Sequence, residues 1–239
     1  MTNSDHIGEA LLAHLAGETR GLMIRRSDGE VFEDRSFERW LAPFPSADPA
    51  EQRLLSLIRP PVLELEAGAG RVSLALRERG IRALPADSSP GCVEALHRRG
   101  LDSARMALGG EDLRGMRFNT LLLLRGGLPV FGTLERTRLW LAGLLDVTEP
   151  GGMLFVGSVL GGWSRDAYRH PDPELAGFEM AVRSRSERGA EVGPWADRLF
   201  PGAQEFVELL DGTGWEPTGE TILFAGGPAL ILSARKGTE

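Results

Sequence analysis

A glycine-rich segment that begins in a strand-like run holds the residues with the clearest potential for chemistry. A turn of this kind lets the backbone come close to a ligand, and the free N–H groups of the following helix then face that ligand. The next strand-like run ends on another acid, a position from which a carboxylate can accept hydrogen bonds from ribose hydroxyl groups. We therefore predict a nucleotide or nucleoside site that includes Glu64, Glu66, Gly68, Ala69, Gly70, Asp87 and Ser88.

The charge of this segment indicates the charge of its ligand. Glu64 and Glu66 would repel the anionic pyrophosphate of a dinucleotide, and Ser73 replaces the third glycine of the dinucleotide fingerprint. The same carboxylates would attract the sulfonium and ammonium groups of S-adenosylmethionine (SAM). The acids therefore favour SAM over a nicotinamide dinucleotide as the ligand.

Elements that position these residues follow from the hydrophobic pattern. From Pro60 onward, short apolar runs alternate with arginine-rich helical segments, which is typical of repeated βα units around a parallel sheet. Residues 215–224 and 229–234 are strand-like and separated by a short turn, so they are predicted to form an antiparallel hairpin. The other predicted strands are 62–66, 81–86, 103–107, 119–124 and 152–158, and the helices are 70–79, 89–99 and 133–147.

Two regions lie outside this pattern. Residues 1–58 are predicted to be an N-terminal cap segment, with helices over 8–16 and 48–58 and a hairpin around residues 27–30, and residues 59–239 form the α/β domain. Within that domain, residues 161–201 are an insertion, in which residues 178–183 alternate as one extra strand. An insertion at the carboxyl edge of an α/β sheet usually shapes a ligand site.

Three motifs resemble those of the class I SAM-dependent methyltransferases. Residues 64–70 are similar to the acidic strand end and glycine loop of that family, and residues 85–91 (Pro-Ala-Asp-Ser-Ser-Pro-Gly) to its second motif. Residues 149–154 (Glu-Pro-Gly-Gly-Met-Leu) resemble the Pro-Gly-Gly turn before its fifth strand. The resemblance covers about residues 55–235, and the region after the fifth strand resembles bacterial members that act on small molecules. It implies a Rossmann-like α/β fold whose sheet is mostly parallel with a C-terminal antiparallel hairpin.

The resemblance also implies roles for individual residues. Glu64 would orient the loop or the methionine amino group, Gly68 and Gly70 would let the backbone approach the methionine part, and Asp87 would bind the ribose hydroxyls. Further residues implied to contact the cofactor are Asp112 near the adenine, and Arg125 and Gly126 after the fourth strand.

Glu66 departs from the family pattern because a small glycine normally stands at its position. The departure leaves three functions open. The first is a methyltransferase acting on a small molecule. The second is a protein of the same fold that uses SAM for other chemistry, such as cyclisation of its aminobutyryl chain, or binds it without catalysis. The third, a nicotinamide-dependent oxidoreductase, is disfavoured by the acids and the C-terminal hairpin.

Candidate catalytic and substrate residues lie in the insertion. His170 is the best placed histidine for a general base, although a histidine in such a turn is more often a surface residue. The aromatic residues would form a wall over the substrate or pack the insertion onto the sheet. Cys92, after Gly91 at the start of a helix, is either a reactive thiol or a packing residue. The predicted substrate residues are Trp163, Tyr168 and Trp195.

Composition excludes several other classes. The 27 basic and 34 acidic residues give a net charge of −7 without a basic block, so a nucleic-acid partner is not expected. The single cysteine and four scattered histidines predict no metal site and no internal disulfide. No apolar run approaches the roughly 20 residues of a membrane span. We expect a cytoplasmic protein whose partner is a small-molecule substrate, and the sequence leaves homodimer formation open.

Overall fold

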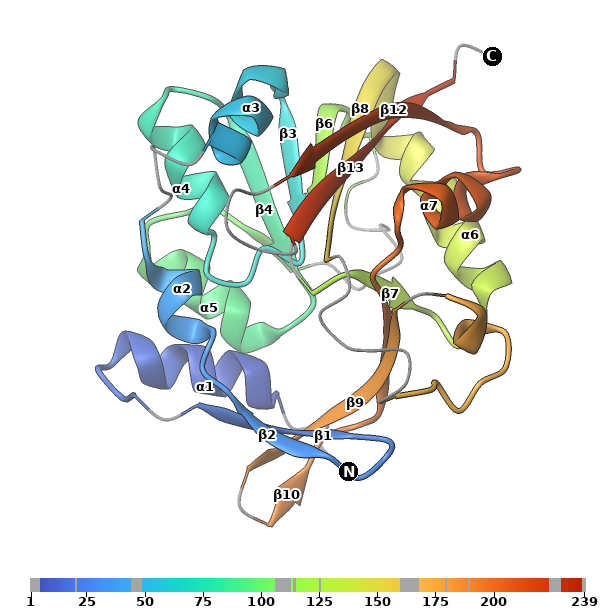
Figure 1. The fold of residues 1–239 in the computed structure, drawn as a ribbon. Coiled ribbons are helices and arrows are strands. Elements are labelled where there is room, and N and C mark those ends of the chain that lie inside the picture. The colour runs from blue at the N-terminus through green and yellow to red at the C-terminus, as the bar shows by residue number, and fades with distance from the viewer. Residues whose placement is uncertain are drawn as a thin grey trace.

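Two sheets make up the framework of the chain. The computed structural model describes residues 5–19, 21–43, 49–105, 113, 115–124, 126–159, 168–178, 180–188, 190–223 and 229–237. Figure 1 shows the larger sheet with helices on both of its faces and the smaller sheet beside one end of it.

The larger sheet has seven strands in the order β12-β13-β8-β6-β3-β4-β5. All pairs from β8 to β5 are parallel, and the C-terminal hairpin β12–β13 joins the edge of β8 in antiparallel fashion. This is the mostly parallel α/β sheet that the sequence predicted. Its strands are β3 (Val62–Leu65), β4 (Ala83–Asp87), β5 (Ala104–Arg105), β6 (Phe118–Leu123), β8 (Thr148–Val159), β12 (Trp215–Leu223) and β13 (Ala229–Lys236).

Both faces of this sheet are buried because alternate residues of its strands point to opposite sides. Leu121 and Leu123 pack in the cluster that contains the apolar residues of α6 and α7, whereas Leu122 packs with those of α3 and α4. On one face lie α3 (Pro49–Leu57), α4 (Arg71–Glu78) and α5 (Pro90–Arg98), and on the other lie α6 (Leu134–Gly143), the 3-10 helix η2 (Leu144–Val147) and α7 (Ala203–Leu210).

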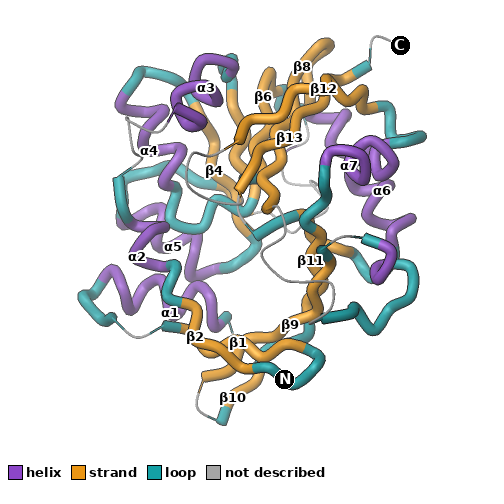
Figure 2. Tube along the Cα trace, in the orientation of Figure 1, coloured by secondary structure: helices purple, strands orange, loops and turns teal. Residues whose placement is uncertain are grey.

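The smaller sheet is antiparallel throughout and combines distant parts of the chain. Its order is β2-β1-β9-β11-β7, with β10 paired to β9. Figure 2 shows β9 running from the large sheet to the N-terminal hairpin. The N-terminal segment and the insertion therefore share one sheet. Its strands are β1 (Leu22–Arg26), β2 (Val31–Asp34), β7 (Leu128–Val130), β9 (Ala181–Arg188), β10 (Glu191–Val192) and β11 (Ala196–Leu199).

The insertion differs from its prediction. It contains three strands rather than one, along with the 3-10 helix η3 (Leu175–Gly177), and its first strand extends through a run in which arginine and serine alternate. Neither face of this part of β9 packs in the core, so apolar residues do not alternate along it. The hydrophobic pattern therefore could not predict this part of the strand. The predicted helix over 133–147 also changes to a 3-10 helix after Gly143. Strand β7 and the short helix α2 (Phe37–Leu41) were not predicted.

The N-terminal helix α1 (His6–Leu15) docks on α5 through two glycines. A Cβ atom on Gly8 would lie 2.6 Å from the Cα of Gly91, so only hydrogen atoms fit between the helices there. Asp5, the N-cap of α1, accepts hydrogen bonds from the backbone N–H groups of Gly8 and Gly91 and from the Ser89 hydroxyl. One carboxylate thus caps α1 and fixes it to the N-terminus of α5.

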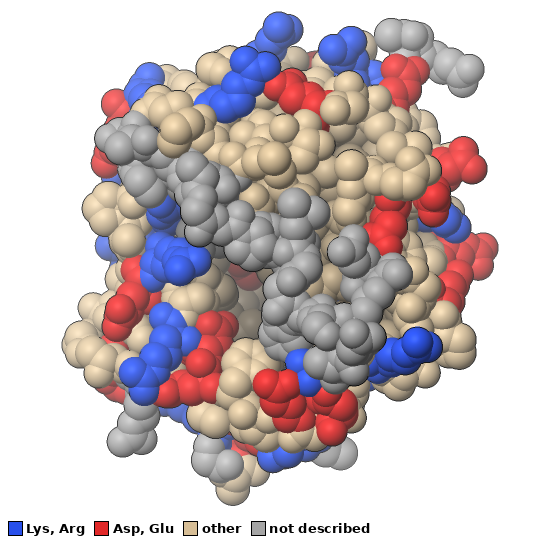
Figure 3. All heavy atoms as spheres, viewed as in Figure 1, with Lys and Arg blue, Asp and Glu red and all other residues tan. Residues whose placement is uncertain are grey.

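The described residues include no helix that is long and apolar enough to cross a membrane, and no group of three or more histidine, cysteine or acidic residues suited to hold a metal ion. On the face shown in Figure 3, basic side chains are interspersed with acidic ones. Glu94 and Arg98 form an ion pair along α5.

Candidate active site

A cavity of about 670 Å³ lies between the two sheets. One wall is the carboxyl end of the parallel strands. It includes Glu66 and Gly68 after β3, Asp87 as the last residue of β4 with Ser88 next to it, and Gly126 after β6. In open α/β sheets ligands bind at this edge, and the volume is ordinary for a small-molecule site. The glycine loop and the acid at the end of β4, predicted as one site, are therefore brought together.

The opposite wall is one face of the smaller sheet. Residues Val182, Ser184 and Ser186 alternate along β9 and all line the cavity. Their cross-strand neighbours line it too, since Ser184 pairs with Ala196 and Val182 with Arg198. The wall is completed by Ile24, Phe32, Asp34, Met180 and Phe200.

A third side comes from the N-terminal segment. Asp5, His6 and Ile7 at the start of α1 line the cavity, as does Trp40 of α2. A Cβ atom on Gly68 would lie 3.7 Å from the Trp40 ring, so this ring covers the glycine loop. The docking of α1 on α5 therefore forms part of the site as well as part of the fold.

Two backbone hydrogen bonds hold Asp87 in the wall at the carboxyl ends of the parallel strands. Because the sequence predicts the cofactor there, we call it the cofactor-side wall. The Oδ2 atom of Asp87 accepts from the N–H of Gly68 at 2.8 Å, and its Oδ1 accepts from the N–H of Ser89 at 2.9 Å. Burial raises the pKa of this carboxyl to about 6, against the two hydrogen bonds, and the nearby charges of Glu66 and Asp5 raise it further. A cationic ligand in the cavity would favour the ionised form.

Glu66 forms an ion pair that joins the two walls. Its Oε2 lies 2.6 Å from Nη1 of Arg198 on β11, and both residues line the cavity. Its backbone has a φ of 50°, in the left-handed region that favours glycine, which costs about 1 kcal/mol for other residues. The loop therefore keeps the backbone shape that a glycine would adopt and adds a carboxylate that Arg198 holds.

No family model matches this sequence, and neither does any curated protein sequence. Solved structures do match its fold. A SAM-dependent methyltransferase from Bacteroides fragilis, in complex with S-adenosyl-L-homocysteine (SAH), has a TM-score of 0.80 at 21% identity, over 99% of this chain and 97% of that one.

This chain has the SAM-dependent methyltransferase fold. Two more structures support the match. The CcbJ methyltransferase from Streptomyces caelestis has a TM-score of 0.60 at 16% identity and covers 83% of this chain and 92% of its own. The glycopeptide N-methyltransferase MtfA, complexed with sinefungin, has a TM-score of 0.56 at 17% identity and covers 81% of this chain and 87% of its own.

The glycine loop of this methyltransferase fold is fixed by local contacts. Gly68 and Gly70 have φ values of 54° and 65°, and a Cβ atom on Gly70 would lie 2.5 Å from side-chain atoms of Leu96 and Leu101. The carbonyl oxygen of the buried Ala69 accepts a hydrogen bond from the guanidinium of Arg99. These glycines are therefore required by the backbone shape, and Gly70 by the packing below it as well.

Glu64 lies behind the loop. It is 4% exposed, and its Oε2 accepts hydrogen bonds from the backbone N–H of Ser73 at 2.9 Å and from the Ser73 hydroxyl at 2.5 Å. These contacts tie the end of β3 to the first turn of α4. They support a role in orienting the loop, which was one of the two roles predicted for Glu64.

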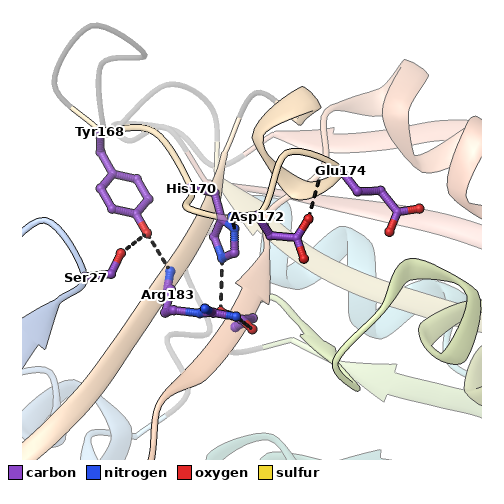
Figure 4. A network of polar contacts seen from close by, with 7 residues as sticks. Ser27, Tyr168, His170, Asp172, Glu174 and Arg183 are labelled. Atoms are coloured by element: carbon purple, nitrogen blue, oxygen red, sulfur yellow. Dashed lines mark hydrogen bonds and ion pairs between the residues drawn. The ribbon is translucent and has the colours of Figure 1, made fainter.

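The insertion residues Tyr168 and His170 lie in a polar network rather than among the described residues that line the cavity (Figure 4). The Tyr168 hydroxyl interacts with Ser27 Oγ and accepts a hydrogen bond from the N–H of Arg183. Arg183 pairs with Asp197, its cross-strand neighbour on β11. Both alternate with cavity-lining residues, so the network occupies the opposite face of the smaller sheet.

Both ring nitrogens of His170 have partners in this network. Nδ1 accepts a hydrogen bond from the N–H of Asp172, and Nε2 lies 3.0 Å from Oδ1 of Asp197. Arg183 and His170 both hold the pKa of Asp197 below its usual range, against the opposing effect of burial. The contacts favour a structural role for His170, and its role as a general base stays a prediction.

Replacing His170 with alanine is expected to destabilise the protein by about 1 to 2 kcal/mol, because a buried hydrogen bond to Asp197 is lost. Affinity for SAM should stay unchanged, since the network lies away from the cavity. Chemical denaturation and titration calorimetry on the same preparation would measure both. Weaker SAM binding without loss of stability would contradict the structural role.

The remaining predicted residues differ in their position relative to the cavity. Trp195 is 44% exposed and stacks on the guanidinium of Arg185, while its neighbour Pro194 lines the cavity. Cys92 is buried in the cluster between α1 and α5 at the edge of the cavity, and burial raises the pKa of its thiol, so these observations favour packing over reactivity. The predicted residues outside the part that the structure describes are Asp112, Arg125 and Trp163.

Sequence reasoning missed several lining residues, notably His6, Trp40 and Arg198. Each reaches the cavity through long-range pairing of elements, which no local motif encodes. One signal was present in Gly8, because a glycine inside a helical pattern often marks close packing against another element.

Proposed function

We propose that this protein is a SAM-dependent methyltransferase that acts on a small molecule bound in the cavity between the sheets. The observation that carries the proposal is the geometry of the cofactor-side wall. There the glycine loop after β3 and the acid at the end of β4 lie side by side, joined by the hydrogen bond from the Gly68 N–H to Asp87. A nucleoside ligand with a positively charged amino-acid chain fits a wall that combines open backbone with carboxylates.

The residues of this wall would hold SAM in distinct ways. Asp87 keeps lone pairs for the ribose hydroxyls, because each of its oxygens accepts one hydrogen bond from the described part of the chain. Gly68 and Gly70 would let the methionine part of SAM come close to the backbone of the loop after β3. When bound, SAM supplies an electrophilic methyl group on a sulfonium. The protein then accelerates transfer chiefly by holding the acceptor in line, and proximity can account for much of the rate.

A small acceptor fits the other wall. The face of the smaller sheet combines apolar side chains with the hydroxyl groups of Ser184 and Ser186 and with the charged groups of Asp34 and Arg198. Pockets for small ligands commonly have such an apolar lining with a few polar groups. We propose that residues 1–58 and the insertion 161–201 act together as the cap that closes over this acceptor, since β1 pairs with β9. Among the similar structures, MtfA is a glycopeptide N-methyltransferase, so the fold also accommodates larger acceptors.

The alternative is non-methyl-transfer chemistry on SAM, or binding without catalysis. Glu66 keeps this alternative open, because its carboxylate stands in the cavity where the resemblance expects no side chain. Its pairing with Arg198 reduces the disturbance to a cofactor, since the charge is already compensated.

Titration calorimetry with SAM, SAH and NAD tests the cofactor assignment. We expect SAM and SAH to bind and NAD not to bind. Mass spectrometry of mixtures with SAM and a library of small hydroxyl and amine compounds then tests the reaction. A methylated acceptor with SAH as co-product supports the proposal, whereas a product formed from SAM alone would support the alternative.

SAM affinity should depend on pH through Asp87. The pKa of this carboxyl is about 6, so it is mostly ionised at pH 7.5 and mostly protonated at pH 5. The dissociation constant of SAM should therefore rise about tenfold as the pH is lowered from 7.5 to 5. The Asp87→Asn variant should lose this dependence. A wild-type affinity that stays constant with pH would show that the ionised carboxylate does not contribute to binding.

The folding stability of the free protein should change with pH in the opposite direction to SAM affinity. A carboxyl whose pKa is raised on folding stabilises the fold when protonated, and this contribution is lost as the pH rises through about 6. Denaturation of wild type and Asp87→Asn at both pH values would separate the two effects.

A further inference from the structure

Among the described residues that line the cavity, carboxylates outnumber guanidinium groups, and the one net positive charge of SAM does not balance the difference. The described lining includes two guanidinium groups, of Arg185 and Arg198. Arg198 pairs with Glu66, and Arg185 hydrogen-bonds to Glu187 and stacks on Trp195. SAM contributes one further positive charge. The carboxylates in the described lining are those of Asp5, Asp34, Glu66 and Asp87.

Among the described lining residues, Asp34 is the carboxylate on the wall formed by the smaller sheet, which we call the acceptor-side wall. The Oδ1 atom of Asp34 accepts a hydrogen bond from the N–H of Ser36 at 2.8 Å, and Oδ2 has no hydrogen bond or ion pair within the described residues. A protonated amine could donate a hydrogen bond to Oδ2 of Asp34 and reduce the net negative charge of the described lining. A carboxylate or phosphate would be repelled by that charge. The electrostatics of the cavity therefore select a basic amine.

A protonated amine must lose a proton before its nitrogen can attack a methyl group, and the cavity contains a route for that proton. His6 is 1% exposed, and its Nδ1 lies 3.0 Å from the hydroxyl oxygen of Ser186, which lines the cavity. Imidazole exchanges protons readily near neutral pH. His6 is thus placed to receive a proton through Ser186.

The second ring nitrogen of His6, Nε2, lies close to a carboxylate that is exposed to solvent. This nitrogen is buried without a hydrogen-bond partner among the described residues, and it lies 3.6 Å from Oε2 of Glu191 on β10. The Glu191 side chain is 66% exposed, so its carboxylate faces both the imidazole and the solvent. It would stabilise a protonated His6 and pass the proton to water.

We propose that the acceptor is a small basic amine, held by Asp34 and deprotonated by His6 acting through Ser186. The ammonium gives one proton to Ser186 while Ser186 gives its own to His6. The free nitrogen then forms a bond to the methyl carbon of SAM as the carbon–sulfur bond breaks, which leaves a methylated ammonium and neutral SAH. The proposal rests on the proposed function and adds its substrate class and proton acceptor.

Binding of three probes of similar shape tests the substrate class. Benzylamine, benzyl alcohol and benzoate are titrated into protein saturated with SAH, which permits binding without reaction. We expect benzylamine to bind about tenfold more tightly than either other probe, with the advantage lost in Asp34→Asn. Equal or tighter binding of the alcohol or benzoate, or no saturable binding of benzylamine, would overturn the assignment. Failure of SAH itself to bind would instead refute the proposed function.

The role of His6 is tested by the rate of N-methylbenzylamine formation from SAM and benzylamine. His6→Gln and Ser186→Ala should each lower kcat about 100-fold and leave KM within about threefold, because they remove proton transfer rather than binding. His97→Gln on the exposed side of α5 is the matched control and should keep the wild-type rate.

Two outcomes would overturn this part of the proposal. They are an unchanged kcat in either variant, and an absence of methylated product from wild type that binds both ligands. Thermal unfolding and SAH affinity identify a variant that fails to fold. If His6→Gln fails in this way, Ser186→Ala carries the test, since Ser186 is only partly buried on the face of a strand.

Discussion

Asp87→Asn is expected to weaken SAM binding about 30- to 1,000-fold, which corresponds to about 2 to 4 kcal/mol. The carboxylate would accept charge-assisted hydrogen bonds from two ribose hydroxyls in a buried setting, and an amide offers one acceptor and no charge. Titration calorimetry at pH 7.5 measures the loss. Asp102→Asn, at an exposed position after α5, is the matched control and should bind SAM as wild type does.

The fold of this variant should survive, and that separates a binding role from a structural one. Burial already makes the ionised form of Asp87 unfavourable, since its pKa lies near 6, so a neutral residue removes a cost at pH 7.5. The lost hydrogen bonds from Gly68 and Ser89 oppose this gain. We expect the free energy of unfolding to change by less than about 1 kcal/mol. Unchanged SAM affinity would remove Asp87 from the cofactor site.

The cofactor-side wall could be predicted from the sequence because it is local. A strand, a tight turn and a helix N-terminus follow one another within about ten residues around Gly68, and their backbone geometry depends on neighbouring residues. The acid at Asp87 follows from the same pattern one βα unit later. The C-terminal hairpin was predicted for a similar reason, since its strands are consecutive.

The acceptor-side wall could not be predicted because it is assembled from distant segments. Pairing of Ile24 with Ser186 joins residues that are far apart in the chain, and the polar alternation of β9 has no apolar period to reveal it. His170 shows how a residue type alone gives too little information about a role. Its residue type suits a general base, but only the pairing of β9 with β11 reveals that Asp197 holds it on the opposite face of the sheet.

The ion pair between Glu66 and Arg198 makes a sharper test of the cofactor site than Glu66 alone. If the Glu66 carboxylate faces the positive charge of SAM, Glu66→Gln should weaken SAM binding about 10- to 100-fold. The variant also leaves the Arg198 charge uncompensated in the cavity. SAH, whose sulfur is neutral, should lose much less affinity. Glu220→Gln on β12, which breaks a surface ion pair with Arg53 of α3, is the matched control for removing a glutamate charge.

Arg198→Met gives the opposite expectation. Removing the guanidinium leaves Glu66 free to act on SAM, so SAM affinity should rise several-fold while SAH affinity stays constant, and the double variant should return toward wild type. Glu66→Gly would relieve the left-handed backbone at this position as well as remove the charge. If the single variants Glu66→Gln and Arg198→Met weaken SAM and SAH equally, the pair clamps the two sheets together and takes no part in recognising the charge of the cofactor.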